Sequence, residues 1–175
     1  MNTSLAEFSF RPMVHADIPM FCEWISRPHV AEWWSDAPSV DEINEWCSPA
    51  ANNRRQDLHY IAILGGRDPV GFIQTYVPCE CHQDGWWLDE NDPGLRGIDQ
   101  FLANAEQLGR GLGTRLIRAF VHRLFEDPSI TRIQSDPAPA NRRAIRCYEK
   151  AGFSAIREIL TPDGAALLMY CDRPR

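Results

Sequence analysis

The sequence has no long apolar run, since the longest one, Ala165–Cys171, is far too short to span a bilayer. Its first ten residues hold neither a basic region nor an apolar stretch, so we expect no signal peptide and a cytoplasmic location. Internal repeats, low-complexity tracts and linker-like segments are also missing. We therefore expect a single domain over residues 1–175, large enough to bury roughly 70% of its unfolded surface.

The six cysteines show neither the spacing of a disulfide framework nor paired CxxC motifs. In a reducing compartment we expect them to be free thiols. Cys79, Cys81 and His82 form one short cluster of potential zinc ligands, but it lacks the second pair that a closed zinc site needs, so we expect no metal. Cys147 lies among apolar helix positions, which favours a structural thiol over a nucleophile.

Positive charge is scarce, because 18 Lys and Arg residues stand against 24 Asp and Glu residues, for a net charge of −6. This balance disfavours nucleic acid and anionic membranes as partners and suits a cationic small molecule. The acidic residues concentrate between Asp84 and Asp99, in the run DGWWLDENDPGLRGID, which also holds Trp86 and Trp87. The run is either a solvated loop or a binding loop, and its place directly before a predicted strand favours binding.

What the chain does have is a glycine-rich segment between a predicted strand and a predicted helix, within Gly97–Phe125. Three alternating glycines, at positions 109, 111 and 113, interrupt the regular backbone. Downstream apolar residues recur with a period of 3.6 and predict a helix with one buried face. These residues are Leu112, Leu116, Ile117, Phe120, Leu124 and Phe125.

Glycines at a helix start allow a tight turn that directs several N–H groups at one point, where the helix adds partial positive charge. We therefore predict a pyrophosphate site, the alternative being a glycine-rich turn without a ligand. A Walker loop is excluded because Thr114 and Arg115 follow Gly113 in place of Lys and Ser or Thr. The dinucleotide pattern GxGxxG fails because the third glycine comes one residue early.

The other apolar patterns predict alternating strands and helices, which indicates a mixed α/β sheet flanked by helices. Predicted strands are Phe8–Val14, Leu58–Leu64, Val70–Val77, Ile130–Asp136, Ser154–Leu160 and Ala165–Tyr170. Predicted helices are one that Asp17 caps and that runs to Ile25, then Pro28–Trp34, Val40–Cys47, and Arg142–Ala151, which Asn141 caps and Gly152 closes. Trp33 and Trp34 cannot both point into one core, so one lines a surface or cleft, unless both are half-buried packing residues.

Two motifs resemble the GNAT acetyltransferase superfamily. The xxGxG spacing at Leu108–Gly113 resembles its coenzyme A loop; the family usually has Gln or Arg where Leu108 stands, so backbone donors must supply most of the binding. NRRAIRCYEKAGF at Asn141–Phe153 matches the family pattern NxxAxxxYxxxGF at every named position. The resemblance implies the GNAT fold and acetyl-CoA as co-substrate. It implies coenzyme contacts from Phe101, Leu102, Gln107, Leu108, Gly109, Arg110, Gly111, Leu112, Gly113, Thr114, Asn141 and Tyr148.

A narrower resemblance, to the aminoglycoside 6′-N-acetyltransferases, covers most of the chain. It rests on EWW at 32–34, DGWW at 84–87, DPGLRGIDQFLAN at 92–104, QLGRGLGT at 107–114, RAIRCYEKAGF at 143–153 and TPDG at 161–164. The resemblance implies acetyl transfer from acetyl-CoA to the 6′-amine of aminoglycosides, and hence antibiotic resistance. It implies that Asp99 and Tyr148 are catalytic, with Asp99 beside the amine and Tyr148 as proton donor to the thiolate. The alternative for Tyr148 is a packing residue. The implied substrate contacts are Trp33, Trp34, Asp84, Trp86, Asp99, Asp136 and Asp163.

The chemistry of amine acylation agrees with this assignment. An amine with the lysine reference pKa of ~10.4 is neutral in roughly one molecule in 2,500 at pH 7, and nearby carboxylates lower that fraction further. Asp99 must therefore hold the amine and take its proton, directly or through water. Two alternatives stay open: a GNAT acyltransferase for a protein N-terminus or a lysine-type amine in siderophore assembly, and a coenzyme A sensor without turnover. Either a monomer or a homodimer is compatible with the sequence.

Overall fold

A seven-stranded sheet runs through the protein. The structure, a computed structural model, describes residues 7–34, 37–48 and 58–174, and within them the strand order is β1-β2-β3-β4-β5-β7-β6. Neighbouring strands are antiparallel except β4 and β5, which are parallel, so the predicted mixed sheet is confirmed. The strands are β1 (Phe8–Pro12), β2 (Leu58–Leu64), β3 (Asp68–Tyr76), β4 (Leu95–Leu102), β5 (Arg132–Ser135), β6 (Ser154–Thr161) and β7 (Gly164–Asp172).

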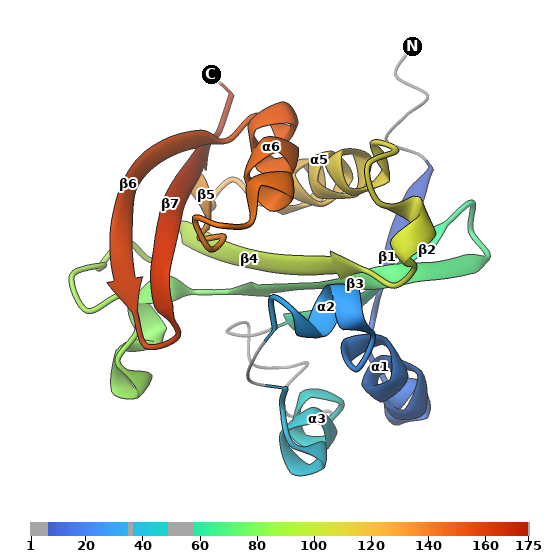
Figure 1. Ribbon diagram of the computed structural model, residues 1–175. Helices are drawn as coiled ribbons and strands as arrows, with labels where there is room; N and C mark the ends of the chain where they lie inside the picture. The colour runs from blue at the N-terminus through green and yellow to red at the C-terminus, as the bar shows by residue number, and fades with distance from the viewer. Residues whose placement is uncertain (1–6, 35–36, 49–57, 175) are drawn as a thin grey trace.

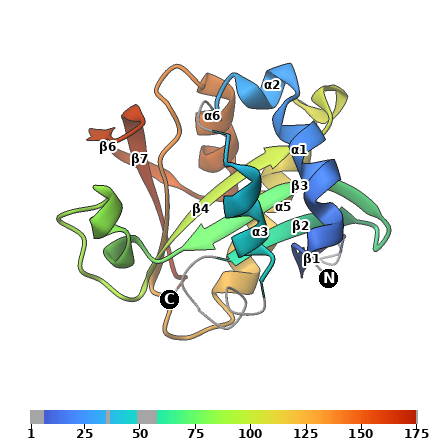
Figure 2. The ribbon, with the colours of Figure 1, turned by 90° about the horizontal axis from the view of Figure 1, so that it is seen from below.

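Helices cover both faces of this sheet (Figure 1). On one face lie α5 (Leu112–Leu124) and α6 (Arg142–Ala151), and on the other lie α1 (Ile18–Ile25), α2 (Pro28–Ala31) and α3 (Val40–Trp46). Figure 2 shows the second face, with the three short helices in front of the strands. Within the described ranges, no helix is both long and apolar enough to cross a membrane.

Each face of the sheet has its own apolar core. On the α5 face, Leu116, Ile117 and Phe120 are fully buried, as the 3.6-residue period predicts. On the opposite face, Phe21 of α1 packs edge-on against Phe72 of β3, with ring centroids 4.9 Å apart. The sheet is therefore held from both sides, and its central strands are rigid supports for side chains at their ends.

The parallel strands β4 and β5 pair only over a short stretch. Leu95–Gly97 lies beside Arg132–Gln134, after which β5 ends at Ser135 while β4 continues to Leu102. The strand predicted over Ile130–Asp136 is therefore shorter than expected, and the prolines that follow it cannot donate to a ladder. The remaining part of β4 has no β5 partner along one side, which we call the open edge.

Asp17 is the N-cap residue of α1, as predicted, but its side chain makes no capping hydrogen bond. Both of its carboxylate oxygens accept hydrogen bonds from the Arg11 guanidinium at 2.6 Å, and one also accepts from the Val14 N–H. This bidentate ion pair holds the pKa of Asp17 below its ordinary value, although burial acts in the opposite direction. An arginine on the preceding strand competes successfully with the helix terminus for the carboxylate.

Candidate functional site

A cavity of about 1360 Å³ lies where β4 and β5 separate. Its lining comes from two sets of elements that are far apart in the sequence. The glycine-rich turn, the start of α5 and the helix α6 form one set. The tryptophans after α2, the loop before β4 and the turn between β6 and β7 belong to the other set. The cavity therefore joins the two regions that the sequence marked separately, one for an anion and one for a cation.

The glycine-rich turn is open on the side where a ligand would bind. Gly109 and Gly111 have φ values of +72° and +80°, and no atom lies within 4 Å of a Cβ placed on either residue. Gly111 is the N-cap of α5, so the unpaired N–H groups of the first helical turn lie at this opening. Gly113 differs, since it lies inside α5 and a Cβ there would be 3.2 Å from the Cys147 Sγ. Only two of the three glycines therefore shape the turn, and the third allows α6 to pack closely.

Most of the predicted coenzyme contacts lie on this cavity. Asn141 is one of them, and its Oδ1 also accepts the Ala144 N–H at 3.0 Å, which confirms that it caps α6. The others that line the cavity are Phe101, Leu102, Leu108, Gly109, Gly111, Gly113, Thr114 and Tyr148. Three predicted contacts, Gln107, Arg110 and Leu112, are outside the lining, and the Leu112 side chain is buried in the core. Contact with a coenzyme stays a prediction for all of these residues, inside and outside the lining.

Three carboxyl groups from separate parts of the chain lie close enough to interact through their charges. Asp99 lies on β4, Asp136 directly follows β5, and Asp163 lies in the turn between β6 and β7. Burial and the nearby Asp163 raise the pKa of Asp99, and a hydrogen bond from Gln74 partly opposes them. Burial, together with Asp99 and Asp163, raises the pKa of Asp136 to about 8. An ammonium group placed here would favour the charged form of all three carboxyls.

Gln74 is the direct neighbour of the Asp99 carboxylate. It stands opposite Asp99 in the β3–β4 register, and its Nε2 donates to Asp99 Oδ2 at 2.9 Å. The sequence analysis missed this residue. The available signal was a glutamine in the middle of an otherwise apolar strand, VGFIQTYV. The pairing itself depends on the strand register, which the sequence pattern does not specify.

Tyr148 is buried and lines the cavity from α6. Burial and the nearby Asp99 raise the pKa of its hydroxyl above the ordinary value, while a hydrogen bond with Ser135 opposes the shift. Its ring packs edge-on against Phe153, with centroids 5.2 Å apart. Tyr148 is therefore a packing residue whose hydroxyl lies near the carboxyl cluster, and its role as proton donor stays a prediction.

The tryptophans form an aromatic wall of the cavity. Trp34 packs edge-on against Phe72 and Phe101 at 5.8 and 5.3 Å, and it still lines the cavity together with Trp33. Trp34 is therefore held in place by core packing, and both Trp33 and Trp34 also present surface to the cavity. Trp86 and Trp87 also line the cavity, and so does the exposed Asp84.

A second aromatic pair on the cavity was missed by the sequence analysis. The rings of Trp46 and His59 stack in parallel, with centroids 4.1 Å apart and an interplanar angle of 5°. Burial lowers the pKa of His59 to about 4, so at neutral pH this surface is uncharged. Nothing in the sequence links the two residues, because they come from α3 and β2 and meet only through the tertiary fold.

In the cluster of Cys79, Cys81 and His82, two side chains make local contacts. His82 Nε2 lies 2.8 Å from the Glu90 carbonyl oxygen, and Cys81 Sγ lies 3.4 Å from the Val77 carbonyl oxygen. None of the six cysteines, all of which lie in the described ranges, forms a disulfide bond. Across the described part of the chain, no group of three or more His, Cys, Asp or Glu side chains is placed to hold a metal ion.

Comparison with known proteins gives consistent results. Residues 13–161 match the acetyltransferase (GNAT) domain family. The aminoglycoside N(6′)-acetyltransferase type 1 of Klebsiella pneumoniae is 49% identical over 168 residues, which cover 94% of this chain and 83% of the relative. A kanamycin resistance protein of Rhizobium radiobacter is 64% identical over 88 residues, 50% of this chain and 82% of the relative. A crystal structure of an aminoglycoside acetyltransferase with coenzyme A and kanamycin is 49% identical, with a TM-score of 0.85 over 95% of both chains.

Proposed function

The chain belongs to the GNAT acetyltransferase family, and from that premise we propose that it transfers acetyl from acetyl-CoA to the 6′-amine of aminoglycosides, which gives antibiotic resistance. The observation that carries the proposal is the single cavity that joins an open glycine turn to three clustered carboxyl groups. A pyrophosphate fits the glycine turn because its anionic oxygens can accept the helix-terminal N–H groups. A polyamine fits the carboxyl cluster.

The relatives support the choice of substrate. At 49% identity over nearly the whole chain, the curated relative is an aminoglycoside N(6′)-acetyltransferase. The solved structure with a TM-score of 0.85 holds coenzyme A and kanamycin together. A cavity that is acidic and aromatic suits such a drug, because carboxylates bind its ammonium groups and aromatic faces cover its sugar rings.

Asp99 and Tyr148 carry the proposed proton transfers. The 6′-amine attacks the thioester carbonyl carbon, a C–N bond forms and the C–S bond breaks. Asp99 takes the proton that the amine loses, directly or through water, and its raised pKa brings it nearer the working pH of a general base. Tyr148, whose buried hydroxyl stays protonated, gives a proton to the departing thiolate. Backbone N–H groups of the open edge stabilise the developing oxyanion.

The substrate contacts follow from the same cavity. We assign the ammonium groups of the drug to Asp84, Asp136 and Asp163, in addition to Asp99 at the reacting amine. We assign the sugar rings to Trp33, Trp34 and Trp86, all of which line the cavity. Trp87, Trp46 and His59 extend the aromatic wall that the sequence analysis described only in part.

The test is thiol release from acetyl-CoA in the presence of kanamycin, followed by matched 6′-amino and 6′-hydroxy aminoglycosides. We expect rapid release with the 6′-amino compounds and little with the 6′-hydroxy compounds, because the hydroxyl is not the nucleophile for which the site provides a base. Equal turnover of the matched compounds would remove the regiochemical assignment. Turnover of a lysine-bearing peptide in place of kanamycin would favour the siderophore-type acyltransferase, and coenzyme binding without any release would favour a sensor.

A further inference from the structure

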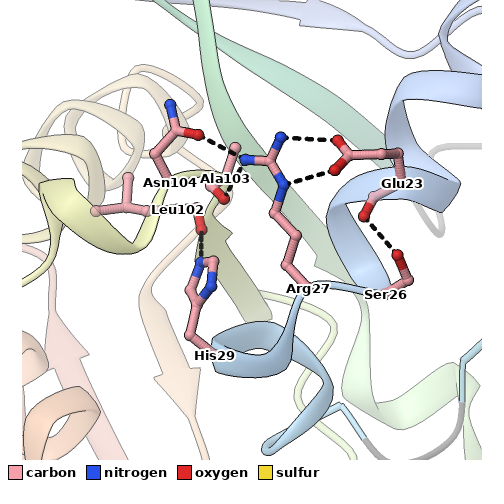
Figure 3. Close-up of polar contacts among 7 residues, drawn as sticks. All are labelled: Glu23, Ser26, Arg27, His29, Leu102, Ala103 and Asn104. Atoms are coloured by element: carbon pink, nitrogen blue, oxygen red, sulfur yellow. Dashed lines mark hydrogen bonds and ion pairs between the residues drawn. The ribbon is translucent and has the colours of Figure 1, made fainter.

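Arg27, the N-cap residue of α2, and His29, within α2, bind the end of β4 (Figure 3). The Nε2 of His29 lies 3.0 Å from the carbonyl oxygen of Leu102. A carbonyl can only accept, so in this contact His29 carries its proton on Nε2 and donates it. The Nη1 of Arg27 donates to the next carbonyl, that of Ala103, at 2.6 Å. Two successive carbonyls, at the end of β4 and directly after it, therefore accept hydrogen bonds from side chains of α2 and its N-cap residue.

Arg27 is itself held in place from both ends. Its Nε and Nη2 donate to the two carboxylate oxygens of Glu23 at 2.9 and 2.7 Å, and its Nη1 also donates to Asn104 Oδ1 at 2.5 Å. Pro28, with its fixed φ, begins α2 between Arg27 and His29. The two donors are therefore presented to β4 with a fixed spacing.

The Leu102 carbonyl faces the open edge of β4. Ala103 N–H donates to the Val70 carbonyl of β3 at 2.9 Å, and the Phe101 carbonyl oxygen lies directly against Gly71 of β3. Successive carbonyls point to opposite sides of a strand, and the C=O and N–H of one peptide group point in opposite directions, so the Leu102 carbonyl points to the side that β5 has left. His29 thus binds a backbone group on the side where the cavity lies, whereas Arg27 secures the residue that follows.

We propose that His29 is a positioning residue for acetyl-CoA, acting by fixing the Leu102 carbonyl on the open edge of β4. The identity of this ligand rests on the proposed function. The open edge offers backbone N–H and C=O groups to the amide groups of the coenzyme's extended arm, and these groups bind best when they are already in place. A carbonyl oxygen has two lone pairs, so one can accept from His29 while the other stays available. His29 and Trp33 lie on the same short segment and both line the cavity. One segment therefore contacts β4 and also contributes to the aromatic wall.

The test is the dissociation constant of coenzyme A, measured by calorimetry on the full chain. In His29→Met the side chain has no donor, and we expect coenzyme A to bind roughly three- to tenfold more weakly, the effect of one hydrogen bond. His29→Gln has nearly the same length as methionine and retains a donor, so its affinity should stay within about twofold of wild type. Ser26→Ala is the matched control, because the Ser26 hydroxyl donates to the Glu23 carbonyl of α1 and not to β4 (Figure 3).

A positioning role and a purely structural role differ in this experiment. We expect His29→Met to raise KM for acetyl-CoA while kcat at saturating coenzyme stays within about twofold. Wild-type affinity in His29→Met, or equal weakening in His29→Gln, would overturn the proposal. Thermal melting accompanies each variant, and His29→Asn, whose amide is too short to reach the Leu102 carbonyl, replaces His29→Met if that variant does not fold. A chain that binds coenzyme A but does not acetylate kanamycin would refute the proposed function and leave this test of His29 intact.

Discussion

Gln74 and Asp99 stand opposite each other on β3 and β4, and the Gln74 amide donates to the Asp99 carboxylate at 2.9 Å. Burial and the neighbouring Asp163 both raise the pKa of Asp99, so the amide is the group that favours its charged form. Gln74 thereby sets how readily the carboxylate can act as a base. The titratable groups that interact with Asp99 are Tyr76 of β3, Tyr148 of α6, Asp136 directly after β5 and Asp163 in the turn between β6 and β7.

Replacing Gln74 by methionine should shift the pH dependence of the reaction. Without the amide, the pKa of Asp99 rises further, a smaller fraction is ionised at a given pH, and the acidic limb of the kcat/KM profile moves to higher pH. A hydrogen bond to a charged group is worth about 1.5–3 kcal/mol, which corresponds to a shift of about 1–2 pH units. The profile with kanamycin measures the shift, and Gln83→Met on the exposed loop is the control. An unchanged acidic limb would separate Gln74 from the base.

Tyr148→Phe should lower kcat and leave the affinity for acetyl-CoA nearly unchanged, because the hydroxyl acts on the leaving thiolate. General acids contribute typically about 10²–10⁴-fold, and water can replace part of that effect. Steady-state kinetics and calorimetry with coenzyme A provide the two readouts, with Tyr60→Phe in the core as the control. Full kcat in the Tyr148 variant, under conditions where chemistry limits the rate, would leave this residue a packing role only.

The acidic loop offers a matched pair of substitutions, Asp84→Asn and Asp89→Asn. Asp84 lines the cavity, whereas Asp89 is an exposed residue of the same loop outside the lining. We expect Asp84→Asn to raise KM for the drug up to about fivefold, the range of a solvent-exposed ion pair, and Asp89→Asn to leave it unchanged. Asp99→Asn should in addition reduce kcat. Equal effects of Asp84→Asn and Asp89→Asn would indicate a general negative field rather than a specific contact.

Drug binding should release a proton from Asp136. Its pKa of about 8 in the free protein leaves the carboxyl mostly protonated at pH 7. A bound polycation stabilises the carboxylate, lowers this pKa and expels the proton into the buffer. Calorimetry of kanamycin binding in two buffers of different ionisation enthalpy counts the protons, and Asp136→Asn should release fewer than wild type. The same count in both proteins would show that Asp136 is not the source.

Gly97→Ala should destabilise the fold at the boundary between the paired part of β4 and its open edge. A methyl group at Gly97 would overlap the ring of Tyr76, which lies opposite it on β3. Overpacking of this kind costs about 1–3 kcal/mol in the free energy of unfolding. Urea denaturation measures the loss, and the effect should be smaller when the change is made in a Tyr76→Ala background. Equal losses in both backgrounds would contradict this steric explanation.

The sequence predicted well those features that depend on local patterns. The period of 3.6 after Leu112 placed α5 and its buried face, because one helix side must meet the sheet. Asn141 and Gly152 marked the ends of α6, because helix termini have specific chemical needs. The two GNAT motifs identified the family, because each one depends on residue spacing within a short stretch of chain.

Features that depend on contacts between elements were not predictable from the sequence. Gln74 meets Asp99 only through the strand register, and Trp46 meets His59 only when α3 packs on β2. Asp17 has the residue type of a helix cap, but the ion pair with Arg11 on β1 overrides that local preference. In each case, the partner is chosen by tertiary packing, for which no local pattern exists.

The carboxyl groups of the cavity differ in their position, since some lie at the centre of the sheet and others at its exposed periphery. Asp99 lies on β4 and Asp136 directly follows β5, whereas Asp84 and Asp163 are exposed on a loop and a hairpin turn. The adjoining strand β6 is largely exposed, and it curves away from the body of the protein (Figure 1). Substitutions in the loop and the hairpin can therefore reshape the drug cavity at little cost to folding. Under a changing antibiotic regime, new drug spectra should arise first through this outer rim, while the central strands keep the chemistry constant.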